Sequence, residues 1–140
     1  MGIVYTEQMT GKEYNELRLS VDWKALTPGQ AERGLAHTAF VVAARDGENI
    51  VAMGRMLFDF GYTAYLGDVI VRPEYQGMGI GTEIVTRLKD KVMEAAEPGD
   101  KIMFLLGAAT GKEGFYEKFG FKVRPNDFSG SGMSMWRVRE

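Results

Sequence analysis

The sequence contains no cysteine and a single histidine. The lack of cysteine excludes a disulfide framework, a thiol nucleophile and a thiolate metal site. One histidine, His37, cannot build a histidine metal centre, so no metal is expected. We expect His37 to have a capping or structural role at the end of a helix.

Long apolar runs and an excess of charge of one sign are missing too. No run approaches the roughly 20 residues of a membrane span, and no signal peptide is visible. The formal net charge of −2 gives no case for a nucleic-acid surface. We therefore expect a cytoplasmic protein with neither a membrane nor a nucleic acid as partner.

The chain has the composition of an ordinary globular protein. Its 140 residues are 45% hydrophobic and 26% charged, which predicts one domain, 1–140, with a substantial core. Expected strands are residues 3–9, 38–44, 50–58, 64–71, 101–106, 121–123 and 133–138. Expected helices follow Thr10, Thr27, Gly79 and Thr110.

The order of these elements indicates the fold class. Asp46-Gly47 predicts a tight hairpin, and the early strands suit an antiparallel meander. A strand, the long helix and a further strand require parallel pairing through a right-handed crossover. The pattern therefore predicts an α/β protein with a mixed, largely antiparallel sheet of about seven strands and about four flanking helices.

The most informative stretch joins the fourth strand to the long helix. Pro73 ends the strand, and Gly77, Gly79 and Gly81 follow at alternate positions. Apolar residues then recur at helical spacing at Ile80, Ile84, Leu88 and Val92. A strand, a glycine-rich turn and a helix start form a phosphate-binding geometry, because the first helix amides point outward at a positive site. The alternative is a tight turn without a ligand.

Capping residues distinguish this helix from the others. Capping boxes are expected at Thr10-Gly-Lys-Glu13, Thr27-Pro-Gly-Gln30 and Thr110-Gly-Lys-Glu113. The glycine-led helix has no such box, which leaves its first amides for water or an anion. Thr82 stands where a dinucleotide fingerprint needs its third glycine, and no lysine lies between the glycine turn and Lys89, so a P-loop is excluded.

The pattern Gln76-x-x-Gly79-x-Gly81 resembles the acetyl-coenzyme A (acetyl-CoA) loop of the GNAT superfamily of N-acetyltransferases. Residues 69–75 resemble the strand that enters that loop, and residues 114–121 resemble the family's late helix and strand. The resemblance implies an acetyl-CoA-dependent N-acetyltransferase. It also implies a GNAT-like sheet that splays between strands 4 and 5, that is, between residues 65–71 and 101–106.

The resemblance gives acetyl-CoA, as cosubstrate, a set of contacts. The amides of the glycine turn would hold the pyrophosphate, and the end of the preceding strand would pair with the pantetheine arm. The implied cofactor-binding residues are Val69, Ile70, Val71, Gln76, Gly77, Met78, Gly79, Ile80, Gly81, Thr82, Gly107 and Phe119. Gly107 and Ala108 would leave room for the acetyl group, or they form a plain strand-to-helix connection.

The implied reaction is direct attack of an amine on the thioester through a tetrahedral intermediate, without a covalent enzyme intermediate. Holding a lysine-like amine neutral at pH 7 costs about 4 to 5 kcal/mol, which a general base offsets. Asp68 is the candidate base; its alternative is a structural carboxylate bonded to backbone amides. Tyr116 matches the family's general-acid tyrosine; its alternative is a core tyrosine between Phe115 and Phe119.

The expected acceptor is a primary amine of a small molecule. Gly67-Asp68-Val-Ile-Val resembles a strand of the glucosamine-phosphate N-acetyltransferases, but Gly67 replaces their glutamate. Residues 107–110 also lack the aspartate of those enzymes, which argues against an amino-sugar phosphate. We expect the early helices and the turn over residues 58–65 to shape the acceptor pocket.

Two other functions stay open, a non-catalytic acyl-CoA binding or sensing domain and a general phosphate or nucleotide site. Arg18 and Arg33 are expected to be solvated at the surface, the alternative being contact with an acidic group of the acceptor. The resemblance also implies that the late strands allow a homodimer, through an exposed edge at residues 129–138.

Overall fold

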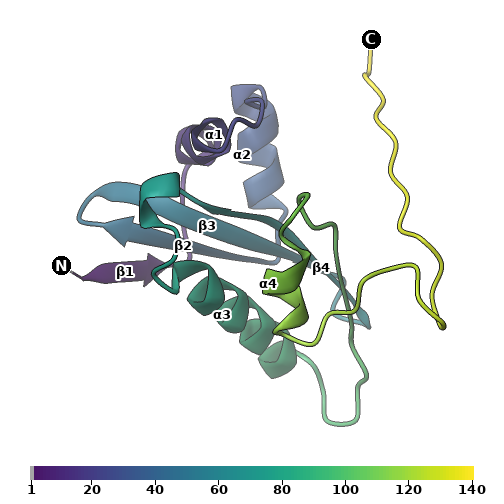
Figure 1. Cartoon of the computed structure of the whole chain (residues 1–140). Coiled ribbons are helices and arrows are strands. Elements are labelled where there is room, and N and C mark those ends of the chain that lie inside the picture. Colours follow the sequence, from purple (N-terminus) through teal and green to yellow (C-terminus); the bar gives the residue numbers. More distant parts are fainter. Residues whose placement is uncertain (1) are drawn as a thin grey trace. The chain divides into compact units, whose positions relative to one another are not determined.

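The structure, a computed structural model, describes residues 2–140. The chain forms two compact units, which we describe separately. The first runs to Phe104 and the second extends from Leu105 to Glu140. The first unit holds the antiparallel sheet and three of the helices (Figure 1).

An antiparallel meander forms the centre of the first unit. Its strands are β1 (Ile3–Thr6), β2 (Phe40–Asp46), β3 (Asn49–Phe58) and β4 (Thr63–Val71). The first four strands pair antiparallel, each with the next, and the order in the sheet is β1-β2-β3-β4-β5. The last strand, β5 (Met103–Leu106), begins where Met103 N donates to Tyr62 O over 2.7 Å.

The predicted hairpin between β2 and β3 is confirmed. Asp46 pairs with Asn49, and Gly47 between them has φ +61°, a conformation that glycine adopts without strain. The turn sets the register of β2 against β3. The alternation of their side chains therefore directs one set of residues to each face of the sheet.

Helices cover both faces of this sheet (Figure 1). Helices α1 (Gly11–Ser20) and α2 (Pro28–Ala36) lie on one face, and α3 (Ile80–Ala95) lies on the other. The short helix α4 (Glu113–Glu117) belongs to the second unit. The prediction of four helices is confirmed. His37 is the C-cap residue of α2, as predicted.

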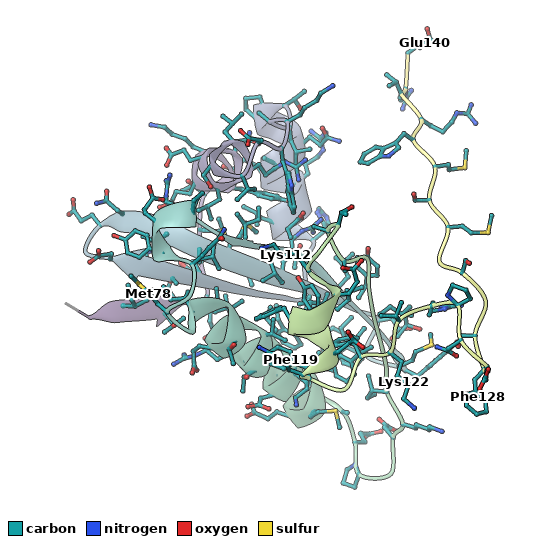
Figure 2. The ribbon with its side chains drawn as sticks, in the orientation of Figure 1. Met78, Lys112, Phe119, Lys122, Phe128 and Glu140 are labelled. Carbon is teal, nitrogen blue, oxygen red and sulfur yellow. The ribbon has the colours of Figure 1, made fainter. Side chains whose placement is uncertain are left out.

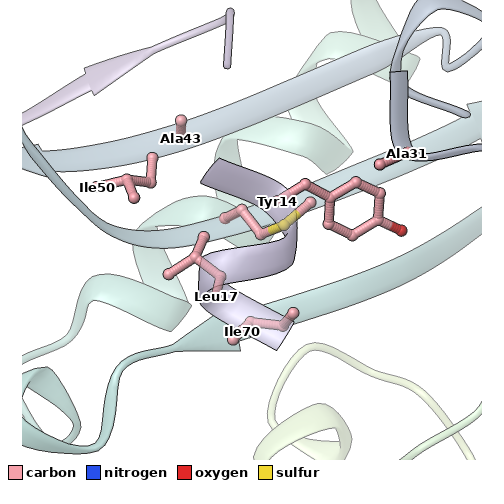
Figure 3. Packing of buried hydrophobic residues seen from close by; sticks show 7 residues of the cluster. Tyr14, Leu17, Ala31, Ala43, Ile50 and Ile70 are labelled. Carbon is pink, nitrogen blue, oxygen red and sulfur yellow. The ribbon is translucent and has the colours of Figure 1, made fainter. Parts of the chain in front are cut away.

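The core on the α1 face gathers side chains from two helices and three strands (Figure 3). Its members are Tyr14, Leu17, Ala31, Ala43, Ile50, Met53 and Ile70. Burying a Leu or Ile side chain stabilises a fold by about 1.5–3 kcal/mol. This cluster therefore holds α1 firmly against β4, the strand that leads to the glycine turn.

Helix α3 approaches the opposite face closely at Gly54. A Cβ atom at Gly54 would lie 2.6 Å from Ile84 Cγ2 and 3.0 Å from Leu88 Cδ1. The buried residues of α3 are Ile80, Ile84, Val85, Leu88 and Val92, which are the predicted apolar stripe together with Val85. The fixed contact with Gly54 positions the N-terminus of α3 beside the end of β4.

The prediction of about seven strands is wrong, because the structure has five. Over residues 2–140, neither segment 121–123 nor segment 133–138 forms a strand. Strand propensity reflects packing against neighbouring strands, and the apolar side chains of the second segment are exposed, with Trp136 at 93%. The apolar residues of 133–138 therefore led to a strand prediction, although no neighbouring strand pairs with them.

The capping box predicted at Thr110 is also wrong. Helix α4 begins at Glu113 with Lys112 as its N-cap residue, and no side chain caps it. Gly111 has φ +85°, so the left-handed backbone there interrupts the turn that a box from Thr110 would need.

The single domain, the splay and the parallel crossover remain predictions. Among the described residues, no helix has the length and apolarity needed to cross a bilayer.

Candidate active site

The turn between β4 and α3 depends on two glycines. After the 3₁₀ turn η1 (Pro73–Tyr75), both Gly77 and Gly79 adopt φ +82°. This left-handed conformation is strained for most residues with a Cβ atom, so glycine is strongly favoured at both positions. The Gln76 side-chain amide donates to Val71 O over 2.9 Å and ties the turn back to β4.

The start of α3 is uncapped, as predicted. Gly79 is its N-cap residue and no side chain caps it; the first helical bond runs from Glu83 N to Gly79 O over 3.0 Å. The amides of Ile80, Gly81 and Thr82 precede that bond and have no partner within the helix. These amides, at the positive end of the helix dipole, could hold an anionic group.

The other two long helices differ. Thr10 Oγ1 accepts from Glu13 N over 3.1 Å, and Thr10 N donates to Glu13 Oε1 over 3.0 Å, which completes the predicted box. Thr27 Oγ1 accepts from Gln30 N over 3.2 Å. The open end of α3 is therefore a specific property of this helix.

The predicted cofactor-binding residues of the first unit fall into two groups. Gln76, Gly77, Met78 and Gly79 are exposed in the turn, where Figure 2 shows Met78, and Thr82 is exposed in the first turn of α3. Ile70 and Ile80 are buried, so they can offer a ligand only backbone groups. Val69 and Val71 are half-buried at the end of β4, and Gly81 is half-buried in the first turn of α3.

A bulge interrupts β4 just before this group. Arg55 of β3 pairs with Gly67 and Met53 pairs with Ile70, so β4 has one more residue than β3 over the same span. Asp68 has φ +51°, which is uncommon for a residue with a Cβ atom and typical of a β-bulge or an active-site turn. The bulge turns Asp68 toward α1, while Val69 lies on the α3 side near Gly54.

Asp68 is held by three side chains from α1 and β3. Tyr14 Oη donates to Asp68 Oδ2, and Arg55 Nε donates to the same oxygen over 2.8 Å. Arg18 Nη1 lies 3.5 Å from Asp68 Oδ1. The predicted base therefore sits in a cluster of one carboxylate and two guanidinium groups, and side chains rather than the backbone amides of the structural alternative bind it.

The cluster keeps Tyr14 protonated. Burial, followed by the hydrogen bond to Asp68, raises the pKa of Tyr14 to about 12. Burial alone would lower the pKa of Arg55, but the hydrogen bond to Asp68, together with the neighbouring Tyr14 and the charge of Asp68, outweighs it, so that pKa is raised. At neutral pH the Tyr14 phenol is therefore a donor and Arg55 a cation, and both stabilise a negative charge on Asp68.

The sequence analysis did not identify Tyr14 and Arg55 as members of this cluster, and its prediction for Arg18 was wrong. The apolar spacing of Tyr14 and Leu17 indicated a buried face, but not the carboxylate that the phenol meets. Arg55 gave no signal, because an arginine within a strand is ordinarily exposed. Arg18, expected to be solvated, instead lies between the rings of Tyr14 and Trp23, 5.9 and 5.5 Å from their centroids.

An open cavity of about 720 Å³ lies beside this cluster. Its walls come from the end of α2, the end of β3 and the β3–β4 turn; they include His37, Thr38, Leu57, Phe58, Phe60 and Tyr65. Arg55 Nη1 donates to Thr38 Oγ1 over 2.8 Å, which links the cavity wall to Asp68. The turn over residues 58–65 does line a pocket, and its use for the acceptor stays a prediction.

The remaining predicted residues lie in the second unit. Tyr116 is half-buried on α4, with its ring 5.0 Å from Phe115 and 6.2 Å from Phe121. Burial raises its pKa, so the phenol stays protonated at neutral pH. Phe119 is half-buried just after α4, and Gly107 is exposed just after β5. Tyr116 therefore has aromatic neighbours, as a core residue would, and carries the proton that a general acid needs. Both interpretations of Tyr116 stay open.

Comparison with known proteins identifies relatives of this chain. The model of the acetyltransferase (GNAT) family matches residues 6–121. An uncharacterized N-acetyltransferase of Porphyra purpurea is 26% identical over 129 residues, which are 89% of this chain and 72% of that protein. A probable acetyltransferase from methicillin-resistant Staphylococcus aureus has a crystal structure that superposes with a TM-score of 0.86, 26% identity and coverage of 97% of this chain and 100% of that one. A GNAT-family protein from Streptococcus pneumoniae follows with a TM-score of 0.75, 26% identity and coverage of 99% and 98%.

Proposed function

Because the chain belongs to the acetyltransferase (GNAT) family, we propose that it transfers an acetyl group from acetyl-CoA to a primary amine of a small molecule. The observation that carries this proposal is the start of α3. Two left-handed glycines, Gly77 and Gly79, lead into a helix whose first amides have no side-chain cap. The other two long helices are capped by threonine, so this end is the one that suits a pyrophosphate.

The residues present fit acetyl-CoA without any metal. The amides of residues 76–82 would bind the pyrophosphate, and the backbone of Val69, Ile70 and Val71 would pair with the pantetheine arm. When bound, acetyl-CoA supplies an acetyl group activated as a thioester. The amide of Val69 or Ile70 would polarise its carbonyl oxygen.

Asp68 and Tyr116 would carry the two proton transfers. Asp68 would take the proton that the amine must lose before its nitrogen attacks the carbonyl carbon. A nitrogen–carbon bond forms and the carbon–sulfur bond breaks, so coenzyme A leaves as a thiolate. Tyr116, kept protonated by burial, would donate to that thiolate.

One observation supports a second candidate function, a non-catalytic acyl-CoA binding domain. The two arginines and the phenol around Asp68 give its carboxylate a complete structural role. A domain of that kind would bind acetyl-CoA at the glycine turn and release no coenzyme A when amines are added.

Three measurements separate the candidates. Calorimetry should show coenzyme A binding, and Gly79→Ala should weaken it. Thiol release from acetyl-CoA should require an amine from a panel of alkylamines, aryl-alkylamines, polyamines and amino sugars. Binding without thiol release would favour the non-catalytic domain. Stronger thermal protection by ATP or NAD than by coenzyme A would instead indicate a general nucleotide site.

We also propose that the chain forms a homodimer through residues 128–138. Five large apolar side chains of this segment are 73–95% exposed, namely Phe128, Met133, Met135, Trp136 and Val138. An apolar stretch of this size is rarely left in water by a monomer. A second copy of the same chain would cover it.

A further inference from the structure

The open cavity beside the Asp68 cluster has an unusual lining. Its volume is about 720 Å³, within the range of small-molecule sites. Three of its walls are the rings of Phe58, Phe60 and Tyr65, and Leu57 adds a fourth apolar surface. Asp59 is the one Asp, Glu, Lys or Arg among the residues that line it. The lining is therefore apolar and aromatic with a single negative charge.

The ring of Phe60, in the β3–β4 turn, is exposed to solvent. Phe60 has φ +62° and its side chain is 62% exposed, although a bulky residue in this conformation is strained. Asp59 Oδ1 accepts from Gly61 N over 2.8 Å and from Thr63 N over 3.2 Å, and these bonds fix the turn. The ring lies 5.0 Å from Phe58 and 6.1 Å from Phe40. Strain and exposure together indicate that this ring serves a ligand rather than the core.

The cavity reaches the bulge of β4. A Cβ atom at Gly67 would lie 3.6 Å from Tyr65 Cε1, so the Tyr65 ring covers the strand next to the bulge. On the α2 side, Thr38 joins the cavity wall to Arg55, and Arg55 binds Asp68. A ligand lying among the three rings would therefore have one end near Asp68.

We propose that this cavity binds the acceptor, and that the acceptor is a primary amine carried by a flat aromatic or similarly apolar body. The inference rests on the proposed function. The rings would cover the body of the molecule with its amine toward Asp68, and the carboxylate of Asp59, farther along the cavity, would draw cations in and repel anions. Asp59 Oδ1 is occupied by the two turn amides, which leaves Oδ2 for this attraction.

The reaction at this site balances with acetyl-CoA and the amine alone. The amine nitrogen forms a bond to the acetyl carbon, and the carbon–sulfur bond breaks. The ammonium loses two protons: Asp68 would take the first before the attack and pass it to solvent, and the second neutralises the departing thiolate. The product is a neutral N-acetyl amide, which no longer has the charge that Asp59 attracts and so leaves more readily.

A second cavity, of about 300 Å³, serves this purpose less well. It lies between β1 and α3, and its lining includes Glu7, Arg87 and Lys91. Lys91 already pairs with Glu7, and Arg87 pairs with Glu83 over 2.7 Å. Both of its cations are therefore paired, Asp90 and Glu94 add further negative charge, and Tyr5 is its one aromatic ring.

The test compares amines that differ only in their body. 2-Phenylethylamine and n-propylamine are acetylated by the full-length protein at saturating acetyl-CoA, with thiol release as the readout. Phe60→Asn removes the ring and keeps a residue that tolerates the left-handed backbone. Tyr62→Asn is the matched control, because Tyr62 is in the same turn, is 58% exposed and does not line the cavity.

We expect the wild-type kcat/KM to be about 10-fold higher for 2-phenylethylamine than for n-propylamine, which is the effect of partly burying one ring. Phe60→Asn should abolish most of that preference and leave the KM for acetyl-CoA unchanged, whereas Tyr62→Asn should preserve it. Equal rates for both amines, or an equal loss in both variants, would overturn the pocket and leave acetyl transfer intact.

Direct binding tests the pocket even if no amine is acetylated. Ligand-observed NMR should detect 2-phenylethylamine on the wild-type protein, more weakly on Phe60→Asn, and should not detect 3-phenylpropionate, which carries the opposite charge. Asp59→Asn retains the acceptor oxygen for the turn and should reduce this difference about 5-fold or more. Binding without turnover would reject the proposed function only, and equal binding of both charges would reject the pocket.

Discussion

The phenol of Tyr14 donates a hydrogen bond to Asp68 Oδ2 and thereby joins helix α1 to the bulge of β4. Tyr14 is buried with Leu17 and Ile70 in the core (Figure 3), so this bond couples the packing of α1 to a strained residue on the sheet. Arg55 binds the same carboxylate oxygen. The predicted base is therefore positioned by the core itself.

Removing the Tyr14 hydroxyl should change how stability depends on pH. The unfolded phenol loses its proton near pH 10, whereas in the folded protein its pKa is raised to about 12. Between these values the folded state binds more protons, so stability falls as pH rises through this window. Tyr14→Phe should remove a decline of about 2 kcal/mol, measured by urea unfolding at pH 9 and pH 11.5. Tyr62→Phe, which alters an exposed phenol, should keep the decline, and an unchanged slope in Tyr14→Phe would contradict the prediction.

Asp68→Asn should separate the chemical role of this residue from its structural role. Asparagine keeps the shape and tolerates φ +51°, but it removes the charge that Arg18 and Arg55 bind. We expect about 1–3 kcal/mol of lost stability and, if the carboxylate is the base, a 10²- to 10⁴-fold lower kcat. Glu13→Gln is the control, because it neutralises the carboxylate that pairs with Arg45 away from the bulge. A kcat within twofold of wild type at full folding would assign Asp68 a purely structural role.

The parts of the fold that follow from local sequence were predicted, and those that depend on distant contacts were not. The Asp46-Gly47 turn, the apolar stripe of α3 and the uncapped start of that helix each depend on neighbouring residues. The bulge does not, because Asp68 adopts a left-handed conformation only where α1 and β3 supply partners. Asp68 was found through its place in a motif, while Tyr14 and Arg55 became visible only when the chain folded.

The failure at the C-terminal end has a similar origin. Residues 133–138 have the composition of a strand, but a strand requires a neighbour with unpaired backbone groups. The sequence reports the preference of each residue and not whether that neighbour exists. The third capping box failed because Gly111 left the helical region, a choice that the threonine and glutamate on either side do not determine.

Tyr116→Phe tests the proposed acid in the second unit. The variant keeps the aromatic packing against Phe115 and Phe121 and removes only the proton donor. We expect kcat to fall about 100-fold while calorimetry shows coenzyme A affinity within twofold of wild type. Because burial raises the pKa of Tyr116, a loss of activity from its ionisation should occur only above pH 10. Unchanged turnover would make Tyr116 a packing residue, and Tyr62→Phe serves as the control.

The exposed C-terminal segment should determine the oligomeric state. If a second copy covers it, the double variant Met133→Ser, Trp136→Ser should raise the dimer dissociation constant about 30-fold, because a buried tryptophan commonly contributes 2 kcal/mol or more to an interface. Sedimentation velocity on the full chain measures this. Met78→Ser, which replaces an exposed methionine in the glycine turn, should leave the dimer unchanged. A wild-type chain that is monomeric at every concentration tested would reject the proposal.

Two glycines with left-handed backbones and different surroundings test whether the start of α3 binds a ligand. Gly79 has φ +82° and Gly47 has φ +61°, and a Cβ atom at either position meets nothing within 4 Å. Gly79→Ala and Gly47→Ala should therefore each lose about 1–2 kcal/mol of stability through backbone strain alone. Only Gly79→Ala should also weaken coenzyme A, by about 10-fold or more, because it tilts the amides of Ile80 and Gly81 away from the anion. Equal coenzyme A affinity in the two variants would show that the open end of α3 is a turn without a ligand.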